Sequence, residues 1–319
     1  MKLAVIGTVT ETKAIEGADR IHQAVVDCGE EGTWSGVVAK DINAIDKVLV
    51  FLQDAVLPPS ERWDFMSKHK WRVRMARFKG VPSECVIVPA IELEQPLFVG
   101  TDLTQLYGVK KHEKPVPAAI AGDVKGSFPD FIPKTDEPNF QRVRDLEDLM
   151  YGTDWIASVK YDGTSCTVWN DEEGMHVCSR NLELKEFTES GAGNVYWRAA
   201  RKFGLDRLPR GIALQFEVMG PGIQGNPCGY DDLEIAVFTA HHIGDRKRLH
   251  FGGLVALCLS LELPIAGIVA AGTGAISEEH IRAIADQARY PNDAQAEGVV
   301  FRSINGDFSF KAISLNYKD

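Results

Sequence analysis

The sequence predicts an α+β protein with two domains joined by a connector, and three observations lead to this fold class. Short apolar runs separated by turn residues fill the N-terminal third, a pattern typical of a small β-barrel or sandwich. A stretch rich in proline and glycine follows over residues 109–135, where regular structure is disfavoured. Residues 136–319 then interleave strand-like alternation with helical periodicity and lack a Rossmann-type glycine motif, which predicts antiparallel sheets with flanking helices.

The N-terminal domain is expected over residues 1–108, because its apolar runs have the length of strands and are bounded by turn residues such as Gly17 and Gly80. The runs are LAVIGTV, IHQAVVD, KVLVFL, WRVRMARF and CVIVPA. In the fourth run, apolar residues alternate with Arg72 and Arg74, which predicts a strand with one basic face.

One basic segment of this domain is a candidate nucleic-acid contact. Residues 68–79 contain six Lys or Arg, one His and no acidic residue. Phosphate backbones attract such patches, although a solvated surface is the alternative interpretation of any basic cluster taken alone. The candidate contacts are Lys70, Arg72 and Arg74.

The chain as a whole is acidic, with a formal net charge of −10, so a nucleic-acid contact must come from the local distribution of charge. Its six cysteines form no C-x-x-C pair, which argues against a zinc site and a disulfide framework and predicts a reducing, cytoplasmic location. The N-terminus does not have the pattern of a signal peptide, and the longest weakly polar run is too short to cross a bilayer. We expect a monomer that makes no membrane contact.

Two segments of the C-terminal domain have clear periodicity. Residues 211–219 alternate, so Gln215 and Glu217 are expected on one face of a strand and apolar side chains on the other. Residues 276–289 carry an apolar stripe at helical spacing, and Ser277 is the expected N-cap of that helix.

Four ionisable residues follow one another on strand-like segments: Lys160, Glu217, Glu297 and Lys311. Lys160 begins the pattern K-x-D-G, in which Asp162 and a glycine form a tight-turn dipeptide after a strand. A lysine nucleophile must lose its proton, and positive charge such as Lys311, a metal ion or burial would lower its pKa. Taken alone, Lys160 would be a surface lysine, but the ordered series favours a nucleophile that carries a nucleotide to a nucleic-acid end.

Other residues have chemistry that suits a nucleotide site. Glu217 precedes a glycine-rich loop that allows close approach of a ligand, and its carboxylate could bind a ribose hydroxyl. Glu297 could hold Mg²⁺, which prefers oxygen ligands. Phe238 could stack on a base, although a core position is the alternative, and Arg180 suits phosphate oxygens or a solvated strand end equally well.

The hairpin that joins Glu297 and Lys311 has two possible registers. A two-residue loop at Asn305 and Gly306 would pair Val300 with Lys311 and place Glu297 and Lys311 on opposite faces. A three-residue loop with a glycine bulge would place both on one face. Because a shared site requires one face, we predict the bulged form, although the other register would pair two phenylalanines.

Two segments of the N-terminal domain, AIEGADRIHQAVVDCG and RMARFKGVPSECVIVP, resemble the OB-type modules that bind tRNA in some synthetase-associated proteins. The match departs from that pattern at Glu84 and Cys85, where the family often has Gly-Met. This resemblance implies an OB-like β-barrel with a shallow groove for single strands or duplex ends.

The segments VKYDGTS, CSRN, FEVMGPGIQG, AEGVVFR and FKAIS, with FIPKTDEPNFQRV upstream, resemble the covalent nucleotidyltransferases and are most similar to RNA ligases. The resemblance covers roughly residues 130–319 and implies a nucleotidyltransferase (ATP-grasp-like ligase) domain over residues 136–319. DNA ligases and capping enzymes continue into a C-terminal OB domain, whereas this chain has its OB-like module upstream. That order resembles the template-dependent, nick-sealing RNA ligases.

The resemblance implies a reaction in three steps. Lys160 attacks ATP and becomes lysyl-AMP, AMP moves to a 5′-phosphate, and a 3′-hydroxyl displaces AMP to seal a nick in a duplex with RNA on the 3′-OH side. Mg²⁺ is the expected metal, with Mn²⁺ as a substitute. By motif position, Glu217 contacts the ribose, Phe238 the adenine and Glu297 a metal.

The same resemblance assigns the remaining residues to the nucleotide. Lys311 contacts the α-phosphate and takes part in catalysis with Lys160, Arg180 contacts phosphate, and Asp162 belongs to the nucleotide site. Many relatives have K-x-K at the last motif, but Ser309 takes the first place here. The alternatives are a DNA ligase, a capping-type nucleotidyltransferase, and a non-catalytic RNA-binding protein with a ligase-like core.

Overall fold

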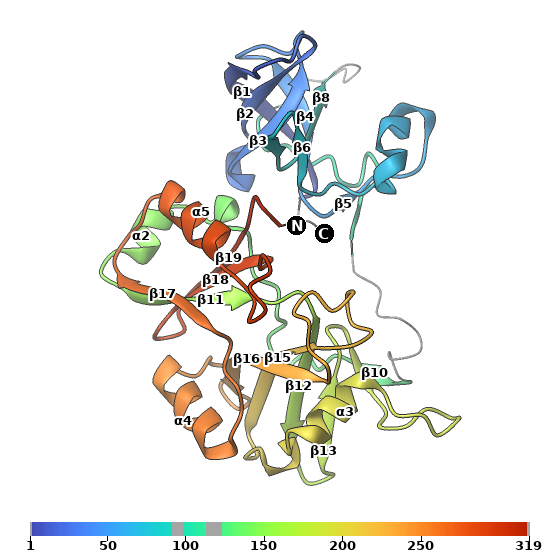
Figure 1. Cartoon of the computed structure of the whole chain (residues 1–319), viewed down its shortest axis with the longest axis vertical. Coiled ribbons are helices and arrows are strands. Elements are labelled where there is room, and N and C mark those ends of the chain that lie inside the picture. Colours follow the sequence, from blue (N-terminus) through green and yellow to red (C-terminus); the bar gives the residue numbers. More distant parts are fainter. Residues whose placement is uncertain (1, 91–97, 113–122, 318–319) are drawn as a thin grey trace. The chain divides into compact units, whose positions relative to one another are not determined.

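The computed structural model describes residues 2–90, 98–112 and 123–317, and the chain divides into two compact units (Figure 1). The N-terminal unit spans residues 1–114 and also includes Gln141–Arg144, and the C-terminal unit contains the remainder up to Tyr317. No helix in the described part of the chain is long and apolar enough to span a membrane. Each unit has its own core, so the two are described separately.

The N-terminal unit is built on an antiparallel five-stranded sheet in the order β3-β2-β1-β4-β8, with two short strand pairs, β5-β9 and β6-β7. Its strands are β1 (Ala4–Ala14), β2 (Ile21–Asp27), β3 (Thr33–Ala39), β4 (Lys47–Phe51), β5 (Ala55–Val56), β6 (Ala76–Phe78), β7 (Val81–Ser83), β8 (Val86–Pro89) and β9 (Lys110–Lys111). Two 3-10 turns, η1 (Gly29–Glu31) and η2 (Glu61–His69), connect them.

Both faces of this sheet are covered by apolar side chains. Alternate residues of β1 enter different clusters, with Val5 and Val9 in one and Ala4 and Ile6 in the other. A strand that is buried on both sides reads as a continuous apolar run, which explains the LAVIGTV pattern in the sequence.

The predicted strand with a basic face at residues 71–75 is wrong. Lys70 and Trp71 both have left-handed backbones, with φ values of 53° and 56°, and two such residues in succession break an extended chain. The strand begins instead at Ala76 and forms a hairpin with β7. Arg72 therefore forms an isolated bridge to Val56 and does not lie on a basic strand face.

The connector expected over residues 109–135 contains two described strands. β9 pairs with β5 of the N-terminal unit, and β10 (Val124–Ser127) pairs with β14 of the C-terminal unit. The prolines at positions 115 and 117 lie outside the described residues.

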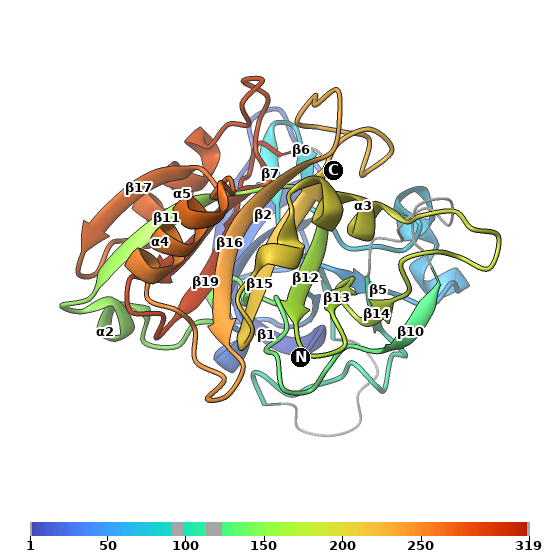
Figure 2. The same ribbon diagram turned by 90° about the horizontal axis from the view of Figure 1, so that it is seen from below.

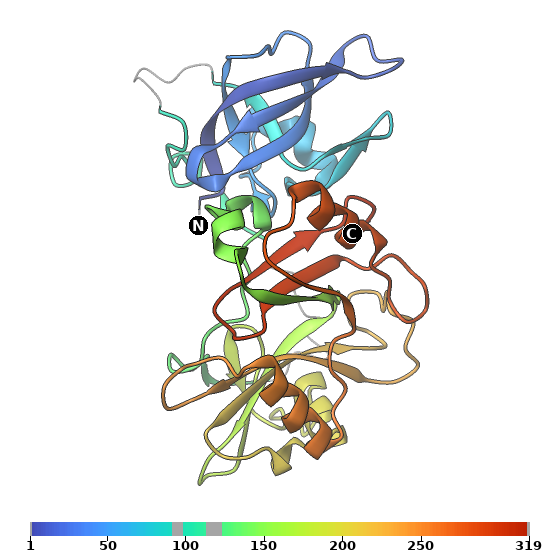
Figure 3. The ribbon, with the colours of Figure 1, turned by 90° about the vertical axis from the view of Figure 1, so that its left-hand side faces the viewer.

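The C-terminal unit contains a six-stranded sheet in the order β10-β14-β13-β12-β15-β16 and a four-stranded sheet in the order β17-β11-β18-β19. The other strands of the first sheet are β12 (Thr164–Asn170), β13 (Met175–Cys178), β14 (Leu182–Leu184), β15 (Ile212–Met219) and β16 (Glu234–His242). The second sheet contains β11 (Asp154–Lys160), β17 (Ile268–Thr273), β18 (Gly298–Ser303) and β19 (Ser309–Ile313) (Figure 3). All strand pairs in both sheets are antiparallel, so the expected antiparallel α+β class is confirmed.

The helices of this unit are short. They are η3 (Phe140–Arg142, shared with the N-terminal unit), α2 (Leu146–Met150), α3 (Val195–Lys202), η4 (Leu205–Arg207), α4 (Phe251–Leu261) and α5 (Glu278–Gln287). The side chain of Ser277 accepts a hydrogen bond from the His280 N–H, which confirms the predicted cap of α5.

The two faces of β15 have different environments. Leu214 and Phe216 belong to the apolar core that α3 and α4 complete over the six-stranded sheet (Figure 2). Gln215 and Glu217 occupy the opposite face, as the alternation predicted, and Gln215 donates a hydrogen bond to the Pro133 carbonyl at 2.7 Å. Residues 131–139 contact both sheets, because Pro133 binds β15 and Asn139 forms an isolated bridge with Lys311 of β19.

Candidate active site

Lys160 is the last residue of β11, a central strand of the four-stranded sheet, where it pairs with Gly298 of β18. Its amine forms an ion pair with Oε2 of Glu297 at 2.5 Å. The Lys160 side chain is 25% exposed and that of Glu297 18%, so both are accessible to a ligand yet partly shielded from water. The structure thus brings together the first and third residues of the ordered series.

Residues 161–163 connect two different sheets rather than the two arms of a hairpin, because β11 and β12 belong to separate sheets. A side chain at Gly163 would collide with the Val218 carbonyl and with Glu217, so only glycine fits this crossing. The Gly163 N–H donates to Oε1 of Glu217 at 3.1 Å. The K-x-D-G pattern therefore positions Lys160 beside a carboxylate of the neighbouring sheet.

Three carboxylates surround the amine of Lys160. Burial raises the pKa of Glu217 to about 8, with Glu297 and Asp162 adding to the effect and Lys160 opposing it. Asp162 is 7% exposed and accepts a hydrogen bond from the hydroxyl of Tyr317. One lysine does not neutralise this acidic cluster, so a further cation would be stabilised here.

The pKa of Lys160 is the result of two opposed effects. Burial lowers it, but Glu297 and Glu217 more than compensate, so the pKa of Lys160 lies above its ordinary value. We expected a lowered pKa with Lys311 as a contributor. In this structure the carboxylates outweigh the burial, and the amine is held as an ammonium ion.

The predicted bulge between β18 and β19 is wrong. Val300 pairs with Lys311, and Phe301 pairs with Phe310, their rings stacked 5.0 Å apart with an interplanar angle of 14°. This aromatic pair in the buried layer stabilises the regular register. Glu297 reaches Lys160 without a bulge because it precedes the first residue of β18.

The regular register places Lys311 on the same face as Lys160. Ser158 pairs with Val300 and Val300 pairs with Lys311, so these three residues share one face of the four-stranded sheet. Lys160 lies two residues beyond Ser158 and therefore has the same orientation. The two lysines of the series thus share one face. The sequence prediction concerned Glu297 and Lys311 instead, and it depended on the bulge that this register rules out.

Phe238 lies at an irregularity of β16, where the register shifts so that Gln215 pairs with Thr239 and Phe216 with Val237. The guanidinium of Arg302, in β18, lies 5.3 Å from the centre of the Phe238 ring. Because Arg302 and Phe238 come from different sheets, the ring is directed toward the space between them.

A buried charged network lies beside Phe238, and the sequence analysis missed it. Arg302 donates to Glu137 and to Oγ of Ser158, each at 3.1 Å. Ser309 also donates to Glu137, and Arg248 donates to Oγ of Ser309 at 3.0 Å. An arginine at the end of the apolar run VVF was the available signal, because a charge there requires a buried partner.

Arg180 lies in the turn between β13 and β14 and forms an ion pair with Asp136. The adjacent residue, Asn181, accepts a hydrogen bond from Lys134 at 3.2 Å. Arg180 is therefore bound to the segment that precedes the domain core.

The candidate nucleic-acid contacts belong to the N-terminal unit. Lys70 is the left-handed residue that ends η2, and Arg74 follows in an irregular segment. Arg72 forms an ion pair with Asp54 at 3.2 Å and is 18% exposed, so its charge is partly neutralised within the unit.

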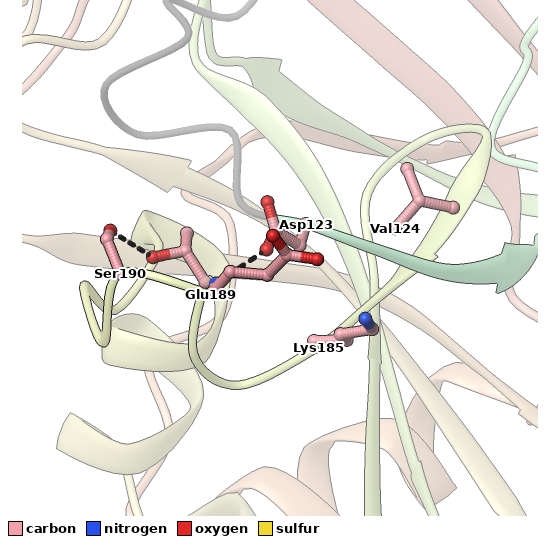
Figure 4. A pocket seen from close by; sticks show the side chains of 6 residues that line it. Asp123, Val124, Lys185, Glu189 and Ser190 are labelled. Atoms are coloured by element: carbon pink, nitrogen blue, oxygen red, sulfur yellow. Dashed lines mark hydrogen bonds between the residues drawn. The ribbon is translucent and has the colours of Figure 1, made fainter.

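A surface pocket of about 620 Å³ lies in the C-terminal unit, where β10 begins and β14 ends (Figure 4). It is lined by Asp123, Val124, Lys185, Thr188, Glu189 and Ser190. Asp123 accepts a hydrogen bond from the Glu189 N–H at 2.9 Å, as the dashed lines show. None of the predicted site residues lines it.

Comparison with known proteins identifies the chain. The family model for RNA ligases matches residues 153–313. The apo structure of a Naegleria gruberi RNA ligase mutant is 31% identical to this chain. The match has a TM-score of 0.85 and covers 99% of this chain and 97% of that chain. The structure of the same ligase with PPi is also 31% identical. Its TM-score is 0.84, and the match covers 98% of this chain and 97% of that chain. A mutant of this ligase with ATP and Mn is 30% identical to this chain. Its TM-score is 0.83, and the match covers 98% of this chain and 97% of that chain.

The search of curated proteins found no match. A lysine that ends a central strand and faces carboxylates between two antiparallel sheets defines a nucleotidyltransferase-type enzyme, in agreement with these structures. Within that class, the chain belongs to the RNA ligase family.

Proposed function

We propose that this RNA ligase uses ATP to join a 3′-hydroxyl to a 5′-phosphate at a nick, through AMP attached covalently to Lys160. The contact that carries the proposal is the 2.5 Å ion pair between the Lys160 amine and Glu297, at the end of a central strand. Structures of the Naegleria gruberi ligase with ATP, with AMP and with PPi support ATP as the nucleotide.

The first step forms a bond between Nζ of Lys160 and the α-phosphorus of ATP. The bond from that phosphorus to the bridging oxygen breaks, pyrophosphate leaves with the electron pair, and the amine loses its protons to solvent. Lys311 shares the face of the sheet with Lys160, so its ammonium can stabilise the charge that develops on the α-phosphate.

Before it can attack, the Lys160 amine must be released from its carboxylate partners, because Glu297 and Glu217 raise its pKa. A divalent metal would relieve this constraint. Mg²⁺ is usually held by one or two carboxylates together with substrate phosphates, and Glu297 offers one such carboxylate beside Lys160. Burial, with the charges of Glu297 and Asp162, raises the pKa of Glu217 to about 8, and a cation bound beside it would favour its charged form.

A bound Mg²⁺ or Mn²⁺ would neutralise these carboxylates and favour the uncharged lysine. In the described part of the chain no group of three or more His, Cys, Asp or Glu side chains forms a preorganised cage. That pattern agrees with a metal that arrives with the nucleotide.

The base and ribose have candidate partners in the same space. The ring of Phe238 is directed between the sheets, where it can stack on adenine, and Glu217 can accept a bond from a ribose hydroxyl. Asp162 completes the acidic cluster around the amine. Arg180, which is bound to Asp136, would contact phosphate after that pair opens.

The second and third steps transfer AMP and seal the strand. An oxygen of the 5′-phosphate attacks the AMP phosphorus, the bond to Lys160 breaks, and the amine is regenerated. The 3′-hydroxyl then attacks the activated 5′-phosphate, and AMP leaves. We infer that the substrate is a nicked duplex with RNA on the 3′-OH side.

The N-terminal unit is the proposed duplex-binding module, an OB-like barrel whose antiparallel sheet has the order β3-β2-β1-β4-β8. Lys70 and Arg74 are its candidate phosphate contacts, and Arg72 is a weaker candidate because Asp54 binds it. We infer a monomeric enzyme of the cytoplasm. The six cysteines are all unpaired and buried, as suits a reducing compartment.

The deciding experiment detects the covalent adduct. The protein, stripped of bound AMP, is incubated with Mg²⁺ and α-³²P-ATP, denatured and examined for label. An acid-labile adduct is expected in the parent and in Lys247→Ala, which removes an exposed lysine, but not in Lys160→Ala. No label in the parent would refute the mechanism and leave a non-catalytic RNA-binding protein.

Substrate specificity needs a second assay. Nicked duplexes in which the 3′-OH strand, the 5′-phosphate strand and the template are separately RNA or DNA are offered to the labelled enzyme. Sealing that requires RNA at the 3′-OH end supports the proposal. Equal sealing of an all-DNA nick would indicate a DNA ligase, and labelling by GTP rather than ATP a capping-type enzyme.

A further inference from the structure

The chain turns back toward Asp162 after its last strand. The Ser314 N–H donates to the Glu297 carbonyl at 2.9 Å, and three residues later the Tyr317 hydroxyl donates to Oδ2 of Asp162. A segment that follows the last motif of the sequence thus contacts the residues on both sides of the Lys160 amine.

Helix α5 holds this segment in place. Oδ1 of Asp286 accepts a bond from the Ser314 hydroxyl at 2.8 Å and another from the Leu315 N–H at 2.6 Å. Ser314 is completely buried, and its hydroxyl oxygen also accepts a bond from the Asn316 N–H at 3.0 Å. These bonds define the path of residues 314–317, so the approach of Tyr317 to Asp162 follows from the fold of the segment.

A second tyrosine holds the backbone at the same place. The Tyr290 hydroxyl accepts hydrogen bonds from the N–H groups of Asp162 and Glu297, each at 3.1 Å. Its ring stacks on Tyr161 with centroids 5.7 Å apart. Tyr290 therefore joins the two chain segments that carry Lys160 and its ion-pair partner.

We propose that Tyr317 is a positioning residue that fixes the Asp162 carboxylate beside Lys160, and that Asp286 holds it in place through residues 314–317. This inference rests on the proposed function. Asp162 is one of three carboxylates around the amine, and a carboxylate with free rotation about its side chain could swing toward Lys160 or away from it. The hydrogen bond from Tyr317 favours one orientation of that carboxylate, so the geometry for attack is established before ATP binds.

The chemistry of Tyr317 suits this role. Burial, together with its hydrogen bond to Asp162, raises the pKa of Tyr317 well above its ordinary value. The hydroxyl therefore keeps its proton and acts as a donor at neutral pH. Phenylalanine would keep the ring and remove only that donor.

The test measures single-turnover formation of the labelled adduct as a function of ATP concentration. We expect Tyr317→Phe to lower the maximal rate by about 10- to 100-fold, the range for losing an outer hydrogen bond that orients an active-site ligand. The ATP concentration for half-maximal rate should change by less than about 2-fold, because uniform binding is untouched. Tyr151→Phe, at an 83% exposed position, is the matched control and should behave as the parent.

Two further variants separate positioning from a general structural effect. In an Asp162→Ala background, which has no carboxylate to orient, Tyr317→Phe should cause no additional loss. Asp286→Ala, which contacts no reacting group, should reproduce the loss and add nothing to Tyr317→Phe. Tyr290→Phe is a poor test, because it leaves two buried N–H groups without a partner at a cost of about 1–3 kcal/mol each.

The outcomes distinguish the two proposals. Normal rates in Tyr317→Phe, or an equal additional loss in the Asp162→Ala background, overturn the positioning role while the labelled parent leaves the ligase mechanism intact. Normal rates in Asp286→Ala overturn the anchoring role of α5. Absence of label in the parent overturns the proposed function and the positioning role together.

Discussion

The N-terminal sheet and the space between the two C-terminal sheets use burial in opposite ways. Around the N-terminal sheet, both faces are covered by apolar side chains, and fully buried residues such as Phe51 and Trp34 fill the cores. Between the C-terminal sheets, Lys160, Glu217 and Arg302 are wholly or partly withdrawn from water. The first arrangement maximises stability, and the second keeps charge where a charged ligand is to be bound.

The difference indicates where stability and function are in conflict. A buried charge destabilises the fold unless it is paired, so a site that holds several charges can be expected to gain stability when they are removed. Apolar cores show no such gain. Removal of an unpaired charge and truncation of a core side chain should therefore differ in sign, whereas breaking a buried charged pair should destabilise the fold as a core cavity does.

The largest expected effect is in the apolar core. Phe51 is completely buried and makes edge-to-face contacts with Trp63 and Tyr107, with ring centroids 5.0 and 6.1 Å apart. Phe51→Ala should lower the free energy of unfolding by about 3–5 kcal/mol, measured by urea denaturation. Phe65→Ala, at a 55% exposed position, is the control and should cost less than about 1 kcal/mol. Similar losses in both would mean that this region is not a close-packed core.

In the charged network around Arg302, the change in stability should depend on whether each charge keeps its partner, and less on the side-chain volume removed. Glu137→Ala leaves Arg302 buried without its carboxylate and should cost about 3–5 kcal/mol. The double variant Glu137→Met with Arg302→Met should lie within about 1 kcal/mol of the parent in the same denaturation assay, because an apolar pair needs no partner. A double variant as unstable as the single one would show that the network is itself stabilising.

Substitution of Glu217 should show the conflict between stability and function directly. Its pKa of about 8 in the folded protein exceeds the ordinary 4.5, so the folded state binds a proton that the unfolded chain releases. The contribution of Glu217 to stability is therefore fully present below pH 4.5 and declines, by roughly 2–4 kcal/mol, as the pH rises to 8. Glu217→Gln should remove this decline, raise the melting temperature at pH 8, and abolish adduct formation.

Glu172→Gln, at an exposed position, provides the comparison and should leave both the pH dependence and the adduct unchanged. If Glu217→Gln lowered the melting temperature at pH 8 instead, the carboxylate would be stabilising, and the comparison between the two regions would fail.

His241 gives the smallest expected effect. Burial, with help from Arg248 and Arg302, lowers its pKa to about 4 from an ordinary 6.5. The folded state thus resists protonation of His241, so the stability that this group contributes is fully present above pH 6.5 and is lost as the pH falls toward 4. His241→Gln should reduce that acid-induced loss by roughly 1–3 kcal/mol in thermal melts between pH 7 and 4. An unchanged acid profile would show that other groups dominate.

Local patterns predicted much of the architecture. The alternation in β15 placed Gln215 and Glu217 opposite the apolar residues, and Ser277 capped α5 as expected. These features depend on the neighbours of each residue along the chain, which a sequence displays directly. The strand predicted at residues 71–75 does not form because Lys70 and Trp71 have left-handed backbones, and no local pattern in the sequence predicted these conformations.

Contacts between distant segments decided the rest. The register of β18 and β19 follows from stacking of Phe301 on Phe310, a packing energy that outweighed the argument for a bulge. Glu137 pairs with an arginine 165 residues away, and Tyr317 reaches a carboxylate 155 residues away. No periodic pattern in the sequence predicts such pairs, because their spacing along the chain depends on the lengths of the elements and connections between them.

The sequence by itself determined the class of enzyme, since Lys160, Glu217, Glu297 and Lys311 occur in a fixed order on segments that favour strands. Tertiary structure alone decided how these groups influence one another. Burial and the distances between charges set the direction of each pKa shift, and here two carboxylates lie close enough to hold Lys160 as an ammonium ion, against the expectation of a lowered pKa. The sequence gives the chemical identity of each ionisable residue, whereas its protonation state depends on burial and on distances that exist only after folding.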